Sequence, residues 1–434
     1  MKNEKRMVLT YCLECLECGR LISDKYTNIC PAGHDSLLRA AYKRKRIRKQ
    51  AGKGMFTYVD WLPVEVALTV NACPITYKSE GFGKELGLHN LYISFSGYWP
   101  EKGAFIKSCT FKELEALPTF QRAKEKAGGK ILLVSSAGNT SRAFAEVSSL
   151  TGMPVLAIVP TSSIHRMWTT TENHPDVFLI SVDGDYSDAI AMGTEVVKME
   201  GLIAEGGVRN VARRDGMGVV ELEAAFFMKV LPDSYFQAVG SGTGAIAAWE
   251  AFIRLIADGR FGQEMPAIAI SQNLPFAPMF RAWQDSRAEI SAEKDMRNAE
   301  EAIKKMYADV LSTRNPPYSI KGGVYDMLVH TKGKIYGITN EECKIAEKLF
   351  EREEGIDLDP AASVACASLI KAVDEGFVKK EDNILLNITG GGYKRLREDY
   401  ETYEIEARME LKSSGQLALN ELEIELKEFV KMHN

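Results

Sequence analysis

Short apolar runs alternate with longer amphipathic stretches along most of this chain of 434 residues. Helical stretches of about 10 to 15 residues between short strands are typical of βαβ units, which build parallel sheets. Seven apolar runs are therefore predicted to be buried strands: NLYISFSG (90–97), KILLVSSAGN (130–139), PVLAIVP (154–160), DVFLISVDG (176–184), YFQAVGSG (235–242), AIAISQN (267–273) and NILLNITGGG (383–392). The pattern indicates an α/β protein.

The two ends of the chain depart from this pattern. Residues 1–50 contain CLECLECG (12–19), CPAGH (30–34) and the basic run YKRKRIRKQ (42–50). Residues 403–434 are predicted to be helical and to pack on the protein or on a neighbouring subunit. The reason is one apolar stripe with spacings of 3, 4 and 3, formed by Leu419, Leu422, Leu426 and Phe429.

Composition narrows the class of protein. Hydrophobic residues make up 45% and charged residues 26%, which is typical of a globular chain with a sizeable core. The net charge of −5 argues against a general nucleic-acid binder. We find no apolar run of about 18 residues, which a membrane helix needs, and no signal-peptide pattern, so we expect a cytoplasmic protein. Eight cysteines in a chain of this length do not indicate a disulfide scaffold.

Three predicted strands end in small polar loops that contain glycine: SSAGNTSR (135–142), GSGTG (240–244) and TGGG (389–392). Ligands of open parallel sheets bind beyond the carboxyl ends of the strands, so these loops are the first candidates for a site. The run from Gly240 to Gly244 leads into a predicted helix, whose free N–H groups suit an anion such as phosphate. A tight strand-to-helix turn is the alternative.

The other two loops also have two interpretations. Ser135, Ser136, Asn139 and Thr140 offer hydroxyl and amide groups that can hold a carboxylate. Asn139 can instead be a helix N-cap. The hydroxyl of Thr389 can meet the ring nitrogen of a cofactor, or it can satisfy a nearby backbone group.

The stretch GYWPEKGAFIKSCTFKELEALP (97–118) contains two candidate lysines, Lys107 and Lys112. A lysine before a helix, the loop SAGNT, the loop GSGTG and a late threonine before three glycines occur in that order. This order resembles the fold type II pyridoxal-phosphate enzymes. That family implies two doubly wound parallel-sheet domains with the cofactor between them, here with a small ribbon-like N-terminal segment. Pyridoxal 5'-phosphate needs a lysine for its Schiff base, a cradle for its phosphate and a partner for its ring nitrogen.

Longer motifs extend the resemblance over roughly residues 10–400. These motifs are residues 62–118, EGGVRNVARRDGMG (205–218), YFQAVGSGTGAIAAWEAF (235–252), ISQNLPFAPM (270–279) and NILLNITGGGYKRLREDY (383–400). Together they resemble the cysteate synthase family, whose members are archaeal relatives of threonine synthase from methanogens. The resemblance implies β-replacement of O-phospho-L-serine by sulfite through an aminoacrylate, on a route to coenzyme M. It also implies a larger cofactor domain (51–128 and 235–400), a smaller domain (129–234), a ribbon-like segment (1–50) and a C-terminal helical extension (401–434).

The same resemblance assigns roles to single residues. Lys112 takes the place of the Schiff-base lysine and moves the Cα proton. The cofactor's ring oxygen, ring nitrogen and phosphate are assigned to Asn139, to Thr389, and to Gly240, Ser241, Gly242, Thr243 and Gly244. Substrate contacts are expected from Lys107, Ser136, Thr140, Arg142, Asn210 and Arg213, although any of these arginines can equally be an ion-pair residue.

The cysteines near the N-terminus suggest a metal site. Threonine synthases often start with a ribbon that carries a C-x-x-C-G knuckle, and Cys15, Cys18 and Cys30 fit part of it. Tetrahedral Zn²⁺ accepts Cys₄ or Cys₃His sets, so either His34 or Cys12 has to be the fourth ligand. The alternatives are a ribbon that folds without metal, or, with the basic run, a nucleic-acid-binding or regulatory module on an inactive scaffold.

Two further expectations concern the substrate and the partners. FKEL (111–114) stands where threonine synthases have F-K-D-R, which argues against threonine synthase acting on O-phosphohomoserine, the alternative enzyme. We expect small-molecule substrates, no nucleic acid, no membrane and a homo-oligomer of two or three chains.

Overall fold

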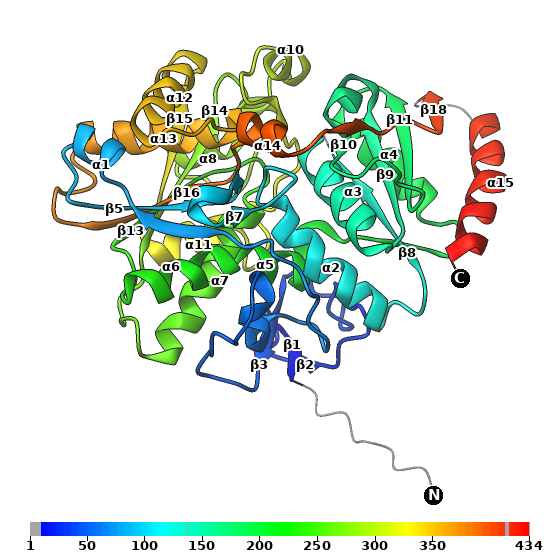
Figure 1. The fold of residues 1–434 in the computed structure, drawn as a ribbon, viewed down its shortest axis with the longest axis horizontal. Helices are drawn as coiled ribbons and strands as arrows, with labels where there is room; N and C mark the ends of the chain where they lie inside the picture. Colours follow the sequence, from blue (N-terminus) through cyan, green and yellow to red (C-terminus); the bar gives the residue numbers. More distant parts are fainter. Residues whose placement is uncertain (1–9, 137, 413–415, 434) are drawn as a thin grey trace, which may run out of the picture.

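Two sheets of mainly parallel strands form the body of the protein (Figure 1). The structure, a computed structural model, describes residues 10–136, 138–412 and 416–433, with side chains of the last segment from residue 421 onward. The larger sheet has the strand order β15-β14-β13-β16-β5-β4, and only β4 is antiparallel to its neighbour. Its strands are β4 (Ile75–Lys78), β5 (Asn90–Phe95), β13 (Ser234–Ala238), β14 (Ala267–Asn273), β15 (Lys334–Ile338) and β16 (Asn383–Ile388).

Helices cover both faces of the larger sheet because its strands are apolar on both sides. One face packs on α1 (Gly81–Glu85), α12 (Asn340–Glu354) and α13 (Pro360–Asp374). The other packs on α6 (Val219–Met228), α7 (Thr243–Asp258), α8 (Pro278–Gln284) and α11 (Val324–Thr331), and α5 (Val211–Met217) packs on α7. Local signals set the helix starts: Thr339 and Glu342 form a capping box for α12, and Asp359 caps α13 before a proline.

The smaller sheet is parallel throughout, with the order β12-β8-β9-β11-β18. Its strands are β8 (Ile131–Ser135), β9 (Val155–Pro160), β11 (Val177–Asp183), β12 (Leu202–Ala204) and β18 (Met409–Lys412). Alternate side chains of β8 and β9 point to opposite faces. One face packs on α2 (Lys112–Lys126) and α3 (Asn139–Thr151), and the other packs on α4 (Tyr186–Val196) and α15 (Gln416–His433).

All seven predicted strands are present, and the expected α/β architecture of fold type II is confirmed. The structure adds β4, β12 and β15, which the pattern did not single out. β12 has three residues, and β15 is interrupted by Gly337, so neither gives a long apolar run. The division of the chain into domains stays a prediction.

The N-terminal segment forms a small antiparallel sheet of order β2-β1-β3, below α2 in Figure 1. Its strands are β1 (Tyr11–Cys15), β2 (Leu21–Ile22) and β3 (Leu38–Tyr42). A buried ion pair ties it to the body: Asp24 accepts two hydrogen bonds of 2.8 Å from Arg122 of α2. We refer to residues 11–42 as the ribbon.

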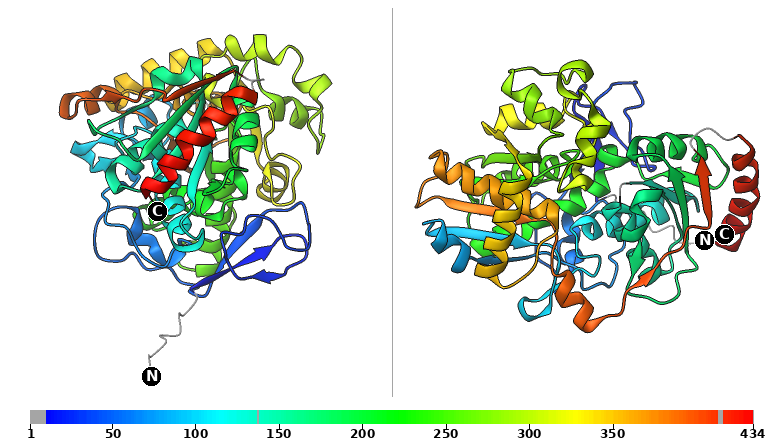
Figure 2. Two further views of the ribbon diagram at one scale, coloured as in Figure 1. Left: turned by 90° about the vertical axis from the view of Figure 1, so that its right-hand side faces the viewer. Right: turned by 90° about the horizontal axis from the view of Figure 1, so that it is seen from above.

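The C-terminal segment differs from the expectation that residues 401–434 are helical. Two short strands come first, β17 (Tyr403–Glu404) and β18, and only then α15. In β18, Met409 and Leu411 alternate with charged residues, a strand pattern that the expectation of a helix missed. Helix α15 lies beside the smaller sheet (Figure 2). Leu422, Leu426 and Phe429 of the predicted stripe are buried there. The side chain of Leu419 lies outside the described residues.

The remaining elements are short connections. None of the described helices has the length and apolar character that crossing a membrane requires. The connecting elements are η1 (Met55–Trp61), β6 (Tyr98–Trp99), η2 (Pro100–Lys102), β7 (Ala104–Phe105), η3 (Thr161–Arg166), β10 (Trp168–Thr169), η4 (Gly207–Arg209), α9 (Ala292–Asp295), α10 (Ala299–Lys304), η5 (Asp309–Leu311) and α14 (Tyr393–Asp399).

Candidate active site

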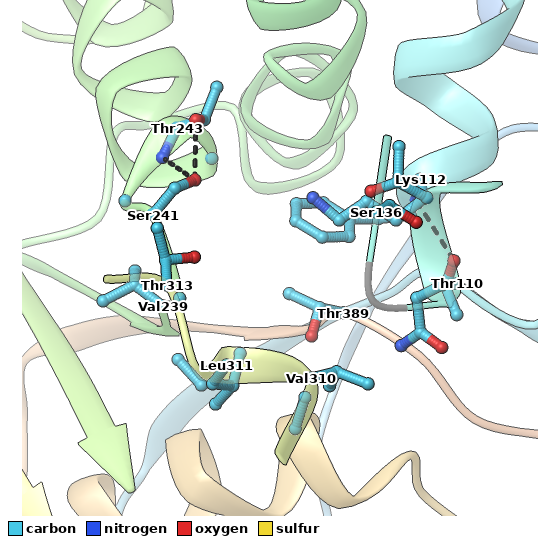
Figure 3. Close-up of a pocket in the computed structure, with 18 of the residues that line it drawn as sticks. Thr110, Lys112, Ser136, Val239, Ser241, Thr243, Val310, Leu311, Thr313 and Thr389 are labelled. Atoms are coloured by element: carbon cyan, nitrogen blue, oxygen red, sulfur yellow. Dashed lines mark hydrogen bonds between the residues drawn. The ribbon is translucent and has the colours of Figure 1, made fainter. Parts of the chain in front are cut away.

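A pocket lies where the predicted loops at the carboxyl ends of β8, β13 and β16 meet the first turn of α2. About 780 Å³ in it is free of protein atoms, including its open mouth. Figure 3 shows Ser241 and Thr243 on one side, Lys112 and Ser136 on the opposite side, and Thr389 between them. The pocket thus collects polar groups from several elements at one concave place, as small-molecule sites do.

Lys112 is the first residue of α2 and lines the pocket. Burial lowers the pKa of its ammonium group, and the charge of Glu115 only partly offsets this effect. Its Nζ lies 3.3 Å from Oε2 of Glu115, one helical turn further on. A lysine with a lowered pKa has a larger share of the neutral amine, which is the nucleophilic and basic form.

The loop from Gly240 to Gly244 lines the other side of the pocket and leads into the 16-residue helix α7. Gly242 has a φ of +83°, and a Cβ there would lie 2.5 Å from Cγ2 of Val324. A Cβ on Gly244 would lie 2.4 Å from Nε2 of Gln237. The positive φ favours glycine at position 242, and a side chain at position 244 would have to displace the end of Gln237. The loop presents backbone and the helix N-terminus to the pocket, where an anion is favoured.

Thr389 lies at the end of β16 and also lines the pocket. Its backbone oxygen accepts a hydrogen bond of 2.9 Å from the N–H of Phe111, which joins β16 to the start of α2. Its side-chain hydroxyl has no hydrogen-bond partner among the described residues, although the residue is 93% buried. The alternative that this hydroxyl satisfies a nearby backbone group does not hold here, and the hydroxyl is free to meet a ligand.

The β8–α3 loop contributes Ser136, Asn139 and Thr140 to the lining. Asn139 is the first residue of α3 rather than its N-cap, and its amide donates a hydrogen bond of 3.3 Å to Asp359. The hydroxyl of Ser136 accepts hydrogen bonds from the N–H groups of Gly138 and Ser141 at 3.1 and 2.9 Å, so it holds the loop in shape.

Arg213 is the second cationic side chain of the lining, and among the described residues it and Lys112 are the only two. Its Nε lies 3.1 Å from Oε2 of Glu115, and its Nη1 donates a hydrogen bond of 2.8 Å to Oε2 of Glu205. Glu115 thus contacts both cations of the pocket. Nη2 of Arg213 makes no hydrogen bond within the described part of the chain and is available to a ligand.

Three predicted substrate residues lie outside the pocket lining. Nζ of Lys107 lies 4.1 Å from the ring centre of Tyr400. Arg142 is buried and donates hydrogen bonds to the backbone oxygen of Ser108 (3.2 Å) and to the hydroxyl of Tyr393 (2.7 Å). These contacts are those of packing residues, and direct substrate contact by either stays a prediction.

The third, Asn210, is fully buried as the N-cap of α5. Its Oδ1 accepts hydrogen bonds from the N–H of Ala212 (3.0 Å) and from Arg122 (2.8 Å). Its amide donates to the backbone oxygen of Glu205 at 2.7 Å. This residue therefore shapes the segment that carries Arg213, and its contact with substrate stays a prediction.

Sequence reasoning missed the acidic residues of the site. Glu115 follows Lys112 at the i,i+3 spacing of a helix, a signal that was present in the sequence. Asp359 lines the pocket and also accepts a hydrogen bond of 2.7 Å from Tyr393. In the sequence, the pair Asp359-Pro360 indicates only the start of a helix and gives no sign of a place in the site. Glu205 had no local signal, because it contacts Arg213 only through the fold.

The side chains of this pocket fit pyridoxal phosphate. An amine of lowered pKa stands opposite a glycine loop at a helix start, and an unpartnered neutral hydroxyl lies between them. These groups match an aldehyde, a phosphate and a ring nitrogen in turn.

Comparison with known proteins also points to an enzyme family that depends on pyridoxal phosphate. Residues 79–390 match the family described as "Pyridoxal-phosphate dependent enzyme". A protein from Methanoculleus marisnigri named cysteate synthase is 53% identical over 408 residues, which cover 94% of each chain. Another of that name from Methanosarcina barkeri is 53% identical over 416 residues, covering 95% of this chain and 99% of its own.

Solved structures agree on the fold. An aspartate racemase that depends on pyridoxal 5'-phosphate superposes with a TM-score of 0.56 at 14% identity, over 74% of this chain and 90% of its own. Maize serine racemase superposes with a TM-score of 0.55 at 13% identity, over 75% and 92%. At such low identity these two neighbours bear on the architecture alone.

Proposed function

We propose, since this chain belongs to the cysteate synthases within the family of pyridoxal-phosphate-dependent enzymes, that it converts O-phospho-L-serine and sulfite into L-cysteate and phosphate. The Cβ–O bond to phosphate breaks and a Cβ–S bond to sulfite forms. The observation that carries this proposal is the pocket that Lys112, Arg213 and a glycine loop at a helix start line together. When bound, the cofactor supplies an aldehyde that holds the substrate's amine and an electron sink that acidifies Cα.

We assign the proton transfers at Cα to Lys112. A general base has to be neutral when it accepts a proton, and burial lowers the pKa of this amine. The same Nζ can return the proton to Cα after sulfite has added. Glu115, 3.3 Å away, would accept a hydrogen bond from the protonated amine and so keep it in place between the two transfers.

The residues that would hold the cofactor follow from the lining. Backbone N–H groups of Gly240 to Gly244, with the hydroxyls of Ser241 and Thr243, would bind its phosphate. Thr389 would meet its ring nitrogen with a neutral hydroxyl. Such a partner leaves the nitrogen unprotonated and the electron sink mild, which suits replacement at Cβ. Asn139 would lie beside the ring oxygen once its amide leaves Asp359.

Both the leaving group and the incoming nucleophile are small oxyanions, and we assign their recognition to Arg213. Its guanidinium is held by Glu115 and Glu205, while Nη2 has no partner among the described residues. An arginine fork matches phosphate and sulfonate oxygens better than a lysine does. The two carboxylates fix its position and leave one edge for substrate.

The test is an assay of phosphate release with two substrate pairs. We expect release, and a new acidic amino acid, from O-phospho-L-serine with sulfite. Little release is expected from O-phosphohomoserine with water, and omission of sulfite is the control for simple elimination. Release from O-phosphohomoserine alone would reject the proposal in favour of a threonine synthase.

The proposed setting is a cytoplasmic homo-oligomer of two or three chains that has no nucleic-acid partner. The basic run of residues 42–50 supports the last point. Arg44 and Arg48 both pair with Asp60, and Lys49 pairs with Glu223. These three pairings within the chain reduce the positive charge that the run offers to a phosphate backbone.

A further inference from the structure

Three cysteines and one histidine of the ribbon converge away from the pocket. Cys15 lies at the end of β1, and Cys18, Cys30 and His34 lie in the loops between its strands. One ligand atom from each residue lies within 4.8 Å of all the others. The sulfurs of Cys18 and Cys30 are 4.0 Å apart, and Nδ1 of His34 lies 3.5 Å from the sulfur of Cys30 and 3.8 Å from that of Cys15.

These separations match the edges of a tetrahedron around one metal ion. With metal–sulfur bonds of about 2.3 Å, tetrahedral ligand atoms are about 3.8 Å apart. A disulfide needs sulfurs about 2 Å apart, and all four cysteines of the segment are free. We propose that Cys15, Cys18, Cys30 and His34 bind one structural Zn²⁺ ion, which clamps the ribbon against the wall of the active site.

The geometry also decides between the two candidates for the fourth ligand. Cys12 is three residues before Cys15 on β1, and residues at odd spacing on a strand point to opposite faces. Its sulfur lies 3.9 Å from the backbone oxygen of Ala41 and is not part of the cluster. His34 completes the set, and the complete set leaves no open position for a substrate or water, as is typical of structural zinc.

The ion would close the loop of residues 19–29, whose tip contacts the segments that carry the site. Asp24 and Asn28 of this loop accept hydrogen bonds from Arg122 of α2. The hydroxyl of Tyr26 donates a hydrogen bond of 3.3 Å to the backbone oxygen of Glu205. Glu205 in turn holds Arg213 in the pocket wall. The chain of contacts therefore runs from the metal ligands to the proposed oxyanion residue.

The first test is the metal content of the purified holoenzyme. We expect about one zinc ion per chain, retained in Cys12→Ser and lost in Cys30→Ser and in His34→Ala. Cys12→Ser is the matched control because it removes a sulfur from the same strand outside the cluster. Wild-type protein that contains no metal, or contains iron in place of zinc, would overturn the assignment. If the ligand variants fail to fold, the wild-type count still decides.

A second test addresses the clamp. Arg20 and Lys25 are exposed trypsin sites within the closed loop. Removal of zinc from the wild-type holoenzyme by a chelator should speed cleavage at these two sites by about tenfold or more, because the loop then opens locally. Cys12→Ser should respond in the same way, and added zinc should restore protection. Cleavage at a rate that the chelator does not change would contradict the clamp.

Discussion

At the scale of single residues, we expect different results from substituting the two neighbouring lysines, Lys107 and Lys112. Lys112→Ala should abolish the cofactor's absorbance band at about 400 nm and lower turnover by about 10²–10⁴-fold or more, because both the cofactor link and the base are lost. Lys107→Ala is the matched control and should keep the band, since its ammonium group packs on Tyr400. Borohydride reduction followed by peptide mass spectrometry gives the labelled residue. A label on Lys107 would show that the sequence was read in the wrong register.

Three of the predicted site features share one property: each lies directly at the end of a predicted strand or at the start of a predicted helix. Lys112, the loop of residues 240–244 and Thr389 could be placed this way, because the carboxyl ends of parallel strands share one edge. Glu205 and Asp359 could not. Their roles depend on tertiary contacts with Arg213 and Asn139, which no local pattern encodes.

At the scale of elements, the C-terminal segment was predicted only in part. The stripe of α15 followed from its helical spacing, whereas β18 has four residues and alternates over too few positions to stand out. β18 pairs with β11 in parallel register, from Ile180 opposite Met409 to Asp183 opposite Lys412. The extension therefore supplies the edge strand of the smaller sheet, and a strand of four residues presents few unpaired backbone groups to other chains.

This packing predicts how the extension contributes to stability. Phe429 is 1% exposed, and its ring centre lies 5.3 Å from that of Phe178 in β11. Phe429→Ala should lower the free energy of unfolding of the smaller sheet by about 3–5 kcal/mol, because it leaves a cavity in the core. Ile424→Ala, on the same helix but 64% exposed, should change it by less than about 0.5 kcal/mol. Equal effects in urea unfolding would mean that α15 does not pack here in solution.

At the scale of the whole molecule, the joint between the ribbon and the body has a charge pair at its centre. Asp24 and Arg122 are both buried, and Asp24 also accepts a hydrogen bond of 2.6 Å from the hydroxyl of Tyr11. Burial alone would raise the pKa of Asp24, but the hydrogen bonds and the charge of Arg122 outweigh it, and the pKa is lowered. The ionised form of this carboxylate therefore stabilises the joint.

The sign of the pH dependence follows from that lowered pKa. A group whose pKa is lower in the folded state stabilises the fold at pH values above its unfolded pKa, about 3.9 for Asp, and this contribution is lost as the pH falls through the folded pKa. Asp24→Asn should cost about 3–5 kcal/mol at neutral pH, because it leaves Arg122 buried without its partner charge. The difference from wild type should begin to shrink as the pH falls below about 3.9, the unfolded pKa of Asp, and should close only as the pH falls through the lowered pKa of the folded carboxyl. Asp35→Asn is the matched control. Asp35 lies in the same ribbon and pairs with Arg209 of the body, but its side chain is 81% exposed. Exposed ion pairs contribute at most about 1 kcal/mol. Thermal unfolding of the three proteins between neutral and acidic pH measures these differences in stability. If Asp24→Asn were less stable than wild type by the same amount at every pH, the carboxylate charge would not be what holds the ribbon to the body.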